Sequence, residues 1–364
     1  MKKSLGKMML GAGLAFGAAA SGHAAERLVY ASYYGEAYTV SKADIWVMSE
    51  IEKRSNGGIK FERYHNATLL KAPDIYPGLS SGAADIASGT PAAYNRNQYR
   101  LSNVALPYIS SDIIAVGKAM KDLYDSNEAF QQEFERRGAK VLYFLPWGES
   151  SFYTGARPLV RAEDFKGQKV RAVQAIAESV EALGGTPVAM TWNEAVEGLT
   201  RGVVDIAGSI PFDSGVFGGI HESAKYASDG GDQGIFSVAA ISINKKRYDS
   251  LSPELQKVID DVAAEAQQKY FELLDESYED VVNRLCTYKG GLTINVFSDE
   301  EAKKTADIVN PIVQGNWTKW AASGNQVDTQ AFLNQYVELV RKYEADSDWK
   351  SGYQRLKDRG CVQQ

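Results

Sequence analysis

The chain has 364 residues, 44% hydrophobic and 24% charged, which is typical of globular proteins and too long for one small core, so we expect two lobes. A formal charge of −6 gives no basic excess for tracking a phosphate backbone, which argues against nucleic-acid binding. Three His and two Cys leave little material for a His/Cys metal site or a histidine-based catalytic site.

The first 25 residues have the pattern of a secretory signal peptide. A start with three lysines precedes a small, apolar run over residues 8–20, and the small side chains at 21–25 suit cleavage. An uncleaved membrane anchor is the alternative, but the run is short and rich in Gly and Ala for a membrane span. No other long apolar run occurs, so we expect a periplasmic protein. Loss of the three lysines would change its formal charge from −6 to −9.

Short β-like runs alternate with helical patterns along the mature chain. The predicted strands are 27–33, 59–64, 84–88, 140–144, 169–173, 187–190, 203–207, 237–243 and 292–296. Helical patterns between them include 42–54, 114–137, 176–183 and 193–200. This alternation predicts an α/β fold with mostly parallel sheets.

One internal repeat stands out. The pattern G-L-x-x-G-x-x-D-I-A-x-x-x-P begins at Gly78 and again at Gly198. Its fifth residue, a glycine, suits a helix C-terminus, and the apolar residues that follow suit a buried strand. Chance similarity of two common turns is the alternative, but seven matches in fourteen positions favour two related lobes. Ligands bind beyond the carboxyl ends of such strands, so we expect loops 88–95 and 208–214 to line one cleft.

The longest helical pattern covers residues 252–286. Ser252 is a plausible N-cap, and Pro253 suits the first turn. At about 1.5 Å per residue the helix would reach roughly 50 Å, so we expect it to pack across both lobes. Two helices with a kink near 275–277 are the alternative. Two further helices are expected at 299–322, bent by Pro311, and at 329–344.

Cys286 and Cys361 are the only cysteines of the chain. Because disulfides persist outside the cytoplasm, we expect a bond that ties the C-terminal tail to the body and contributes roughly 2–4 kcal/mol. Two free thiols remain the alternative, since the sequence does not show that the two residues come close.

Motifs of the common enzyme classes are absent. The sequence has no G-x-S-x-G elbow, H-E-x-x-H, C-x-x-C or P-loop. His65 and His221 are isolated, and each is more often a surface or capping residue than a catalyst. We therefore predict no enzymatic activity, no cofactor and no metal site.

Aromatic and cationic side chains do gather near predicted strand ends. Arg171 ends one strand, where an arginine can hold a carboxylate by two parallel hydrogen bonds, as lysine cannot. A structural ion pair is the commoner use of an arginine. Trp147 and Phe152 follow another strand, while Trp192 and Phe212 have plainer interpretations as a packing residue and a loop anchor.

Four segments resemble motifs of one family, the periplasmic solute-binding subunit of tripartite ATP-independent periplasmic (TRAP) transporters, of the dicarboxylate-binding-protein-like type. Residues 164–171 (D-F-K-G-Q-K-V-R) are similar to D-L-K-G-L-K-I-R, and 183–188 (L-G-G-T-P-V) to L-G-A-T-P-V. Residues 202–205 (G-V-V-D) resemble G-x-V-D-G, and 55–60 (S-N-G-G-I-K) resemble S-N-G-x-I-x. The resemblance covers roughly residues 28–342.

The resemblance implies two α/β lobes that close on an organic acid, with a long helix bracing both. It implies that Arg171 forms a salt bridge with the ligand carboxylate and that membrane subunits of a TRAP transporter recognise the closed form. The implied division is 26–146 with 236–268 for the first lobe, 147–235 with 269–345 for the second, and 346–364 as a tail.

Departures from the family pattern bear on the ligand. Ile206 stands where the family often has Gly, and 149–154 lacks the extra arginine of sialic-acid-binding members, whose asparagine after G-x-V-D-G is also unmatched. The segment 211–213 (P-F-D) resembles the P-W-E of a divergent subgroup. One cation beside aromatic side chains suits a monocarboxylate with an apolar or aromatic body better than a sialic acid or a C4-dicarboxylate.

The predicted ligand contacts divide by chemistry. Arg171 clamps the acid; Trp147, Phe152, Trp192 and Phe212 shape the apolar part; Tyr33, Thr90 and Asp213 supply polar contacts. Three alternatives remain: a binding subunit that serves a sensor, a secreted enzyme on the same scaffold, and a carboxylate bridged by a metal that Asp213 binds.

Overall fold

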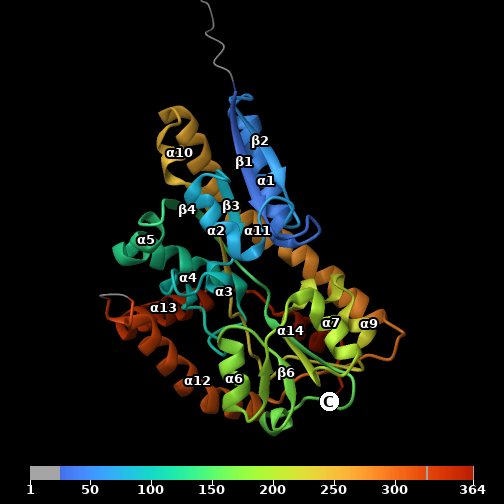
Figure 1. Ribbon diagram of the computed structural model, residues 1–364. Helices are drawn as coiled ribbons and strands as arrows, with labels where there is room; N and C mark the ends of the chain where they lie inside the picture. Colours follow the sequence, from blue (N-terminus) through green and yellow to red (C-terminus); the bar gives the residue numbers. More distant parts are fainter. Residues whose placement is uncertain (1–24, 325–326, 364) are drawn as a thin grey trace, which may run out of the picture.

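The computed structural model describes residues 25–324 and 327–363, with only the backbone of Trp192 and Asn193, and it has an α/β fold with two sheets (Figure 1). The predicted signal peptide lies outside the described residues, apart from Ala25. The first sheet contains, in spatial order, β2 (Ile59–Tyr64), β1 (Glu26–Ser32), β3 (Ile86–Gly89), β10 (Val238–Asn244) and β4 (Ala139–Pro146). The second contains β11 (Thr293–Asn295), β9 (Tyr226–Ser228), β5 (Ser150–Thr154), β8 (Ile206–Pro211), β6 (Lys169–Arg171) and β7 (Thr186–Val188).

The sheets are mixed rather than mostly parallel. β1 pairs in parallel with β2 and β3, and β6 with β7 and β8, but β10 and β5 run antiparallel to both of their neighbours. The chain enters both of these antiparallel strands from the other sheet, β5 after β4 and β10 after β9, whereas β11, entered after β10, pairs in parallel with β9. The sequence prediction missed β5 and β9, because neither has a distinctive apolar pattern.

The internal repeat has the same conformation in both lobes. Helices α2 (Ile75–Ser81) and α7 (Trp192–Thr200) precede glycines with left-handed backbone, Gly82 at φ 81° and Gly202 at φ 70°. The repeat's aspartate then accepts a hydrogen bond from a neighbouring strand at the same place: Asp85 from the Val29 N–H at 2.8 Å, and Asp205 from the Lys169 N–H at 2.8 Å. Each copy thus fixes the strand that follows it, β3 beside β1 in the first lobe and β8 beside β6 in the second.

Helices cover the sheets of both lobes (Figure 1). In the first lobe they are α1 (Thr39–Arg54), α3 (Pro91–Tyr94), α4 (Ile113–Ser126), α5 (Glu128–Glu135) and α10 (Lys245–Asp249), and in the second α6 (Ala175–Ala182), α8 (Phe212–Phe217) and α9 (Ile220–Ser223). Most of the buried apolar side chains form one core, and a smaller cluster in the second lobe includes Tyr153, Leu199 and Ile220.

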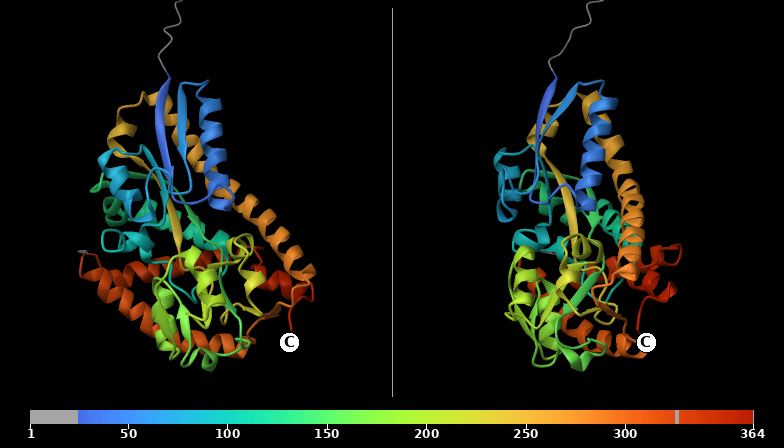
Figure 2. Two further views of the ribbon diagram at one scale, coloured as in Figure 1. Left: turned by 45° about the vertical axis from the view of Figure 1, so that its right-hand side comes forward. Right: turned by 90° about the vertical axis from the view of Figure 1, so that its right-hand side faces the viewer.

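The long helix is unbroken. α11 (Pro253–Thr287) has 35 residues and begins where the Ser252 side chain accepts a hydrogen bond from the Leu255 N–H. Its first part packs on α1 and β4 of the first lobe. Farther along, it packs on α8 of the second lobe and on α14 (Gly352–Asp358), and Figure 2 shows its course along both lobes. The predicted single helix across both lobes is therefore observed, and the alternative of a break near residues 275–277 is not.

The C-terminal helices contact both lobes. α12 (Asp299–Ala322) continues through Pro311 and packs on α6, whereas α13 (Thr329–Glu344) packs on α4 of the first lobe. The division of the chain at 146, 235, 268 and 345 stays a prediction, and α13 joins a segment expected in the second lobe to the first.

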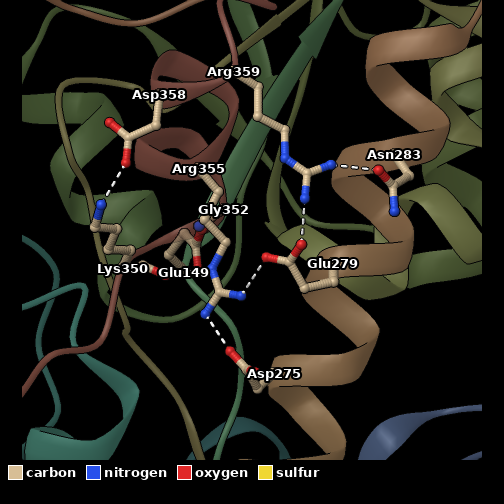
Figure 3. Close-up of polar contacts among 9 residues, drawn as sticks. All are labelled: Glu149, Asp275, Glu279, Asn283, Lys350, Gly352, Arg355, Asp358 and Arg359. Atoms are coloured by element: carbon tan, nitrogen blue, oxygen red, sulfur yellow. Dashed lines mark hydrogen bonds and ion pairs between the residues drawn. The ribbon is translucent and has the colours of Figure 1, made fainter.

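The end of the chain is fixed to α11. Cys286 and Cys361 form the expected disulfide, with Cα atoms 5.3 Å apart. Helix α14, which the sequence analysis missed, places Arg355 against Asp275 at 2.6 Å and Glu279 at 2.9 Å (Figure 3). Arg359 adds contacts to Glu279 and Asn283 on the same face of α11.

Candidate functional site

Arg171 is a buried cation at the carboxyl end of β6. Its side chain is held by backbone carbonyls: Nη1 donates to Gly208 at 3.1 Å and Ser209 at 2.9 Å, and Nε donates to Met190 at 3.3 Å. The residue is 6% exposed, and no carboxylate of the described residues forms an ion pair with it. Burial lowers the pKa of Arg171 to about 10, so the group stays charged at neutral pH.

Hydrogen-bonded aromatic side chains form a wall at the corresponding edge of the first lobe. Trp147 Nε1 donates to Thr90 Oγ1 at 3.1 Å, and the Tyr34 hydroxyl shares a hydrogen bond with the same oxygen at 2.6 Å. The Tyr33 hydroxyl donates to that of Tyr34 at 2.7 Å. The rings of Tyr33 and Tyr94 meet edge to face, with centroids 5.3 Å apart. Of the predicted contacts, Tyr33, Thr90 and Trp147 are thus brought together.

The aromatic wall faces the arginine through Tyr94. Burial raises the pKa of the Tyr94 hydroxyl, and the charge of Arg171 in the other lobe opposes that rise. Tyr94 is 46% exposed, the most of the large apolar side chains around it. The arrangement offers one cation, several hydroxyls and ring faces, which suits binding of an acid. The wall and Arg171 include no nucleophile with an adjacent base.

Phe152 lies in the core of the second lobe and not in the aromatic wall. It is 0% exposed and packs edge to face on Phe165, with centroids 5.3 Å apart. Its ring fills the space beneath Gly208, where any added Cβ would come within 2.5 Å of it. Phe152 therefore supports the backbone that holds Arg171.

Phe212 and Asp213 also lie away from the aromatic wall. Phe212 packs on Tyr278 and Tyr353, between α11 and α14. The Asp213 carboxylate accepts hydrogen bonds from Thr39 Oγ1 of the first lobe at 2.8 Å and from Ser277 Oγ of α11 at 3.2 Å. Asp213 thus connects the two lobes and the long helix, and its partners are donors that suit an anion.

The side chain of Trp192 is outside the described part of the structure, so its predicted role stays a prediction. His65 and His221, for which a surface or capping role was expected, are buried, and burial lowers the pKa of both. Tyr34 and Tyr94 were missed, although Tyr94 lies in loop 88–95, which the repeat had already singled out.

Within residues 25–324 and 327–363, none of the helices combines the length and apolar character that crossing a bilayer requires. The same residues contain no group of three or more His, Cys, Asp or Glu side chains placed for a metal ion. The metal-bridged alternative through Asp213 has no support from this geometry.

Comparison with known proteins identifies the family. The family model for bacterial extracellular solute-binding proteins, family 7, matches residues 36–319. The ectoine-binding periplasmic protein TeaA of Halomonas elongata is 23% identical over 87% of this chain and 91% of its own. The chain therefore belongs to family 7 of the bacterial extracellular solute-binding proteins and is a periplasmic solute-binding protein of the TRAP type.

Solved structures support the fold. A TRAP periplasmic solute-binding protein from Desulfovibrio salexigens is 27% identical, with a TM-score of 0.75 over 89% of this chain and 98% of its own. A TRAP solute-binding protein from Rhodoferax ferrireducens, solved with copurified benzoate, is 20% identical, with a TM-score of 0.76 over 88% and 99% of the two chains. The predicted two-lobed binding-protein fold is confirmed.

Proposed function

We propose that this protein captures a small organic monocarboxylate with an apolar or aromatic body and delivers it to the membrane subunits of a TRAP transporter. The observation that carries the proposal is Arg171, a buried guanidinium with no acidic partner among the described residues. Burying a charge without a counter-charge is costly, so natural proteins keep such a group where a ligand supplies the opposite charge.

The contacts of Arg171 suit a carboxylate. The carbonyls of Met190, Gly208 and Ser209 engage Nε and Nη1 and thereby fix the plane of the guanidinium. Nη2 has no hydrogen bond to the described residues, and it can donate to an incoming oxygen. A pre-oriented arginine loses little conformational entropy on binding, which favours affinity.

The single arginine of the candidate site favours a ligand with one carboxylate. Arg171 pairs with Ala207 across β6 and β8, and the same position of the first repeat, Ala87, pairs with Ala31 of β1. The first lobe thus has a small apolar residue where the second has the arginine. Its contribution is the wall that includes Tyr33, Tyr34, Tyr94 and Trp147, which suits a ring or an apolar body.

Known neighbours agree with this ligand class. Besides the benzoate-containing structure, a marine metagenome TRAP solute-binding protein specific for aromatic acid ligands was solved with metahydroxyphenylacetate, at 22% identity and a TM-score of 0.76. Others were solved with a uronate or with orotic acid. At these identities the likeness supports the fold, and the ligand class rests on Arg171 and the aromatic wall.

Closure of the lobes would bring Arg171 and the wall onto opposite sides of the ligand. The chain crosses between the sheets at residues 147–149 and 229–237, and α11 packs on β4 of the first lobe and α8 of the second. Such a hinge around a ligand is a common way to hide it from water and to create a recognised surface.

The test is a thermal-shift screen of the mature protein, unfolded and refolded first to remove carried-over ligand. Aliphatic, hydroxy- and aromatic monocarboxylates are compared with dicarboxylates and with ectoine. At about 100 times its dissociation constant, a ligand should stabilise the fold by roughly 2.7 kcal/mol. A rise confined to monocarboxylates with a net negative charge supports the proposal, and a rise only with dicarboxylates or only with ectoine, a zwitterion without net charge, contradicts it.

A further inference from the structure

A second group of arginines surrounds a cavity outside the inter-lobe site. The cavity has a volume of about 280 Å³ and lies between α5, the segment after α3 and the end of α12 (elements at the left in Figure 1). Its polar lining consists of Asn97, Gln98, Arg100, Glu133, Arg136 and Arg137. None of these residues belongs to the aromatic wall or contacts Arg171.

The arginines of this group are unusual because they form no ion pairs with the described carboxylates. Five described arginines have no carboxylate oxygen within 4.0 Å, and they are Arg100, Arg136, Arg137, Arg157 and Arg171. Three of the five line this one cavity, in a protein whose formal charge is −6. Arginines elsewhere, such as Arg54 with Glu265 at 2.6 Å, have acidic partners.

Neutral groups contact all three guanidiniums, and Arg136 Nη2 donates to the side-chain oxygen of Gln132. Arg100 donates to the carbonyl of Trp320 at 2.6 Å and also to the side chain of Ser323, and it lies over the Trp320 ring. Arg137 donates to the carbonyl of Glu133 at 2.7 Å and lies over the Tyr99 ring. These contacts orient the groups without neutralising their charge.

The one acidic side chain of the cavity is engaged elsewhere. The Glu133 carboxylate accepts hydrogen bonds from the backbone N–H groups of Leu101 at 2.8 Å and Ser102 at 3.0 Å, and the residue is 6% exposed. It attracts Arg137 electrostatically but forms no ion pair with it within 4.0 Å. Burial raises its pKa to about 7, which further weakens it as a counter-charge at neutral pH.

We propose that this cavity binds a phosphate group, either free inorganic phosphate or the phosphate of a lipid headgroup. Several guanidiniums around one cavity match a tetrahedral oxyanion, because arginine presents paired N–H donors that fit phosphate oxygens. The amides of Asn97 and Gln98 add neutral donors at the rim. This site is separate from the one proposed for the monocarboxylate.

The first experiment is calorimetric titration of inorganic phosphate at low ionic strength. Wild type and R171K should bind phosphate equally and saturably. R136Q should weaken binding by at least about tenfold, and R136Q/R137Q should abolish it. The control R161Q/R201Q removes two exposed arginines elsewhere and should change affinity by less than about twofold, the effect of net charge alone.

A second arm tests the source of the phosphate with vesicles of anionic phospholipid and with neutral vesicles. If the protein cosediments with anionic vesicles, and R136Q/R137Q loses this binding while R161Q/R201Q retains it, the site binds a headgroup. Saturable binding of free phosphate assigns the site to the free ion. No binding in either arm, or an equal loss in the control, overturns the proposal. Circular dichroism of each variant establishes that the fold is intact, and R136Q, which changes an exposed side chain, carries the test if R137Q unfolds.

Discussion

The two copies of the internal repeat begin alike and end differently. Both have a glycine-terminated helix, an aspartate that accepts an N–H from the neighbouring strand, and a buried strand. The first copy then leads to Thr90 and Tyr94, in the aromatic wall. The second leads to Phe212 and Asp213, buried against α11 and α14. The repeated residues therefore build the lobes, while tertiary surroundings decide what the loops that follow them do.

The largest expected effect concerns the packing of Phe212, which follows the second copy of the repeat. Phe212→Ala should lower the free energy of unfolding by about 3–5 kcal/mol, because it leaves a cavity beside Tyr278 and Tyr353. Phe217→Ala, on the same helix but half-buried, is the matched control and should cost about 1 kcal/mol. Urea denaturation measures both. Equal losses would contradict the assignment of Phe212 to the packed core.

A second test concerns Glu149, whose carbonyl accepts the N–H of Phe212 and whose carboxylate contacts Tyr278 and Gly352. Burial raises the pKa of Glu149 to about 7. The folded state thus holds this proton more tightly than the unfolded chain, so the group's stabilising contribution is present at low pH and is lost as pH rises through about 4.5 to 7.

Glu149→Gln should therefore reduce the loss of stability between pH 5 and pH 8 by on the order of 1–3 kcal/mol, measured by urea denaturation at both pH values. Glu338→Gln removes an exposed carboxylate from α13 and should leave the pH dependence unchanged. An E149Q curve that parallels wild type at both pH values would exclude the buried carboxyl as its source.

Substitution of the repeat's aspartate should lower the stability by a similar amount in both lobes. Asp85→Asn and Asp205→Asn each weaken a charge-assisted hydrogen bond to a backbone N–H, so each should cost about 1–2 kcal/mol in thermal or chemical denaturation. Asp125→Asn, at an exposed ion pair with Lys121 on α4, should cost less than about 0.5 kcal/mol. A loss of stability at only one of the two positions would show that the two aspartates do not contribute equally to folding.

The smallest expected effect concerns ligand binding by Tyr94, which follows the first copy of the repeat. Tyr94→Leu should weaken binding of an aromatic acid by about threefold to tenfold, since it removes a ring and a hydroxyl from the wall. Stability should not change, because the side chain is 46% exposed. Tyr64→Leu, at 36% exposure on β2, is the control for calorimetry. Unchanged affinity in Y94L would place the ligand away from this tyrosine.

Much of the fold could be predicted because it depends on local pattern. The uninterrupted 3–4 spacing after Ser252 predicts α11, and the glycine and aspartate of the repeat predict matching turns in both lobes. Strands β5 and β9 and helix α14 were missed, since each is short and is stabilised by partners distant in sequence. Arg355, for example, is fixed by Asp275 and Glu279 on α11.

The candidate site was less predictable, because a residue type does not show which way a side chain points. Phe152 and Trp147 both follow a strand predicted from the sequence, yet Phe152 lies in β5 and packs beneath Gly208, while Trp147 reaches Thr90. Tyr34 stands next to Tyr33, and only the hydrogen bond between their hydroxyls shows that it belongs to the wall. Strand-end position located Arg171, but the carbonyls that orient it come from Met190, Gly208 and Ser209.

The most direct test of the central claim is calorimetric titration of the best ligand of the thermal-shift screen into wild type, R171K and R157K. Arg157 is an exposed arginine without an acidic partner in the described part of the chain, so R157K controls for the substitution itself. Because lysine cannot reproduce the planar donors that hold Arg171 on the Met190, Gly208 and Ser209 carbonyls while Nη2 reaches the ligand, R171K should lose at least about 100-fold in affinity with its fold intact, while R157K binds as wild type does. Equal affinity in R171K and wild type would contradict the account.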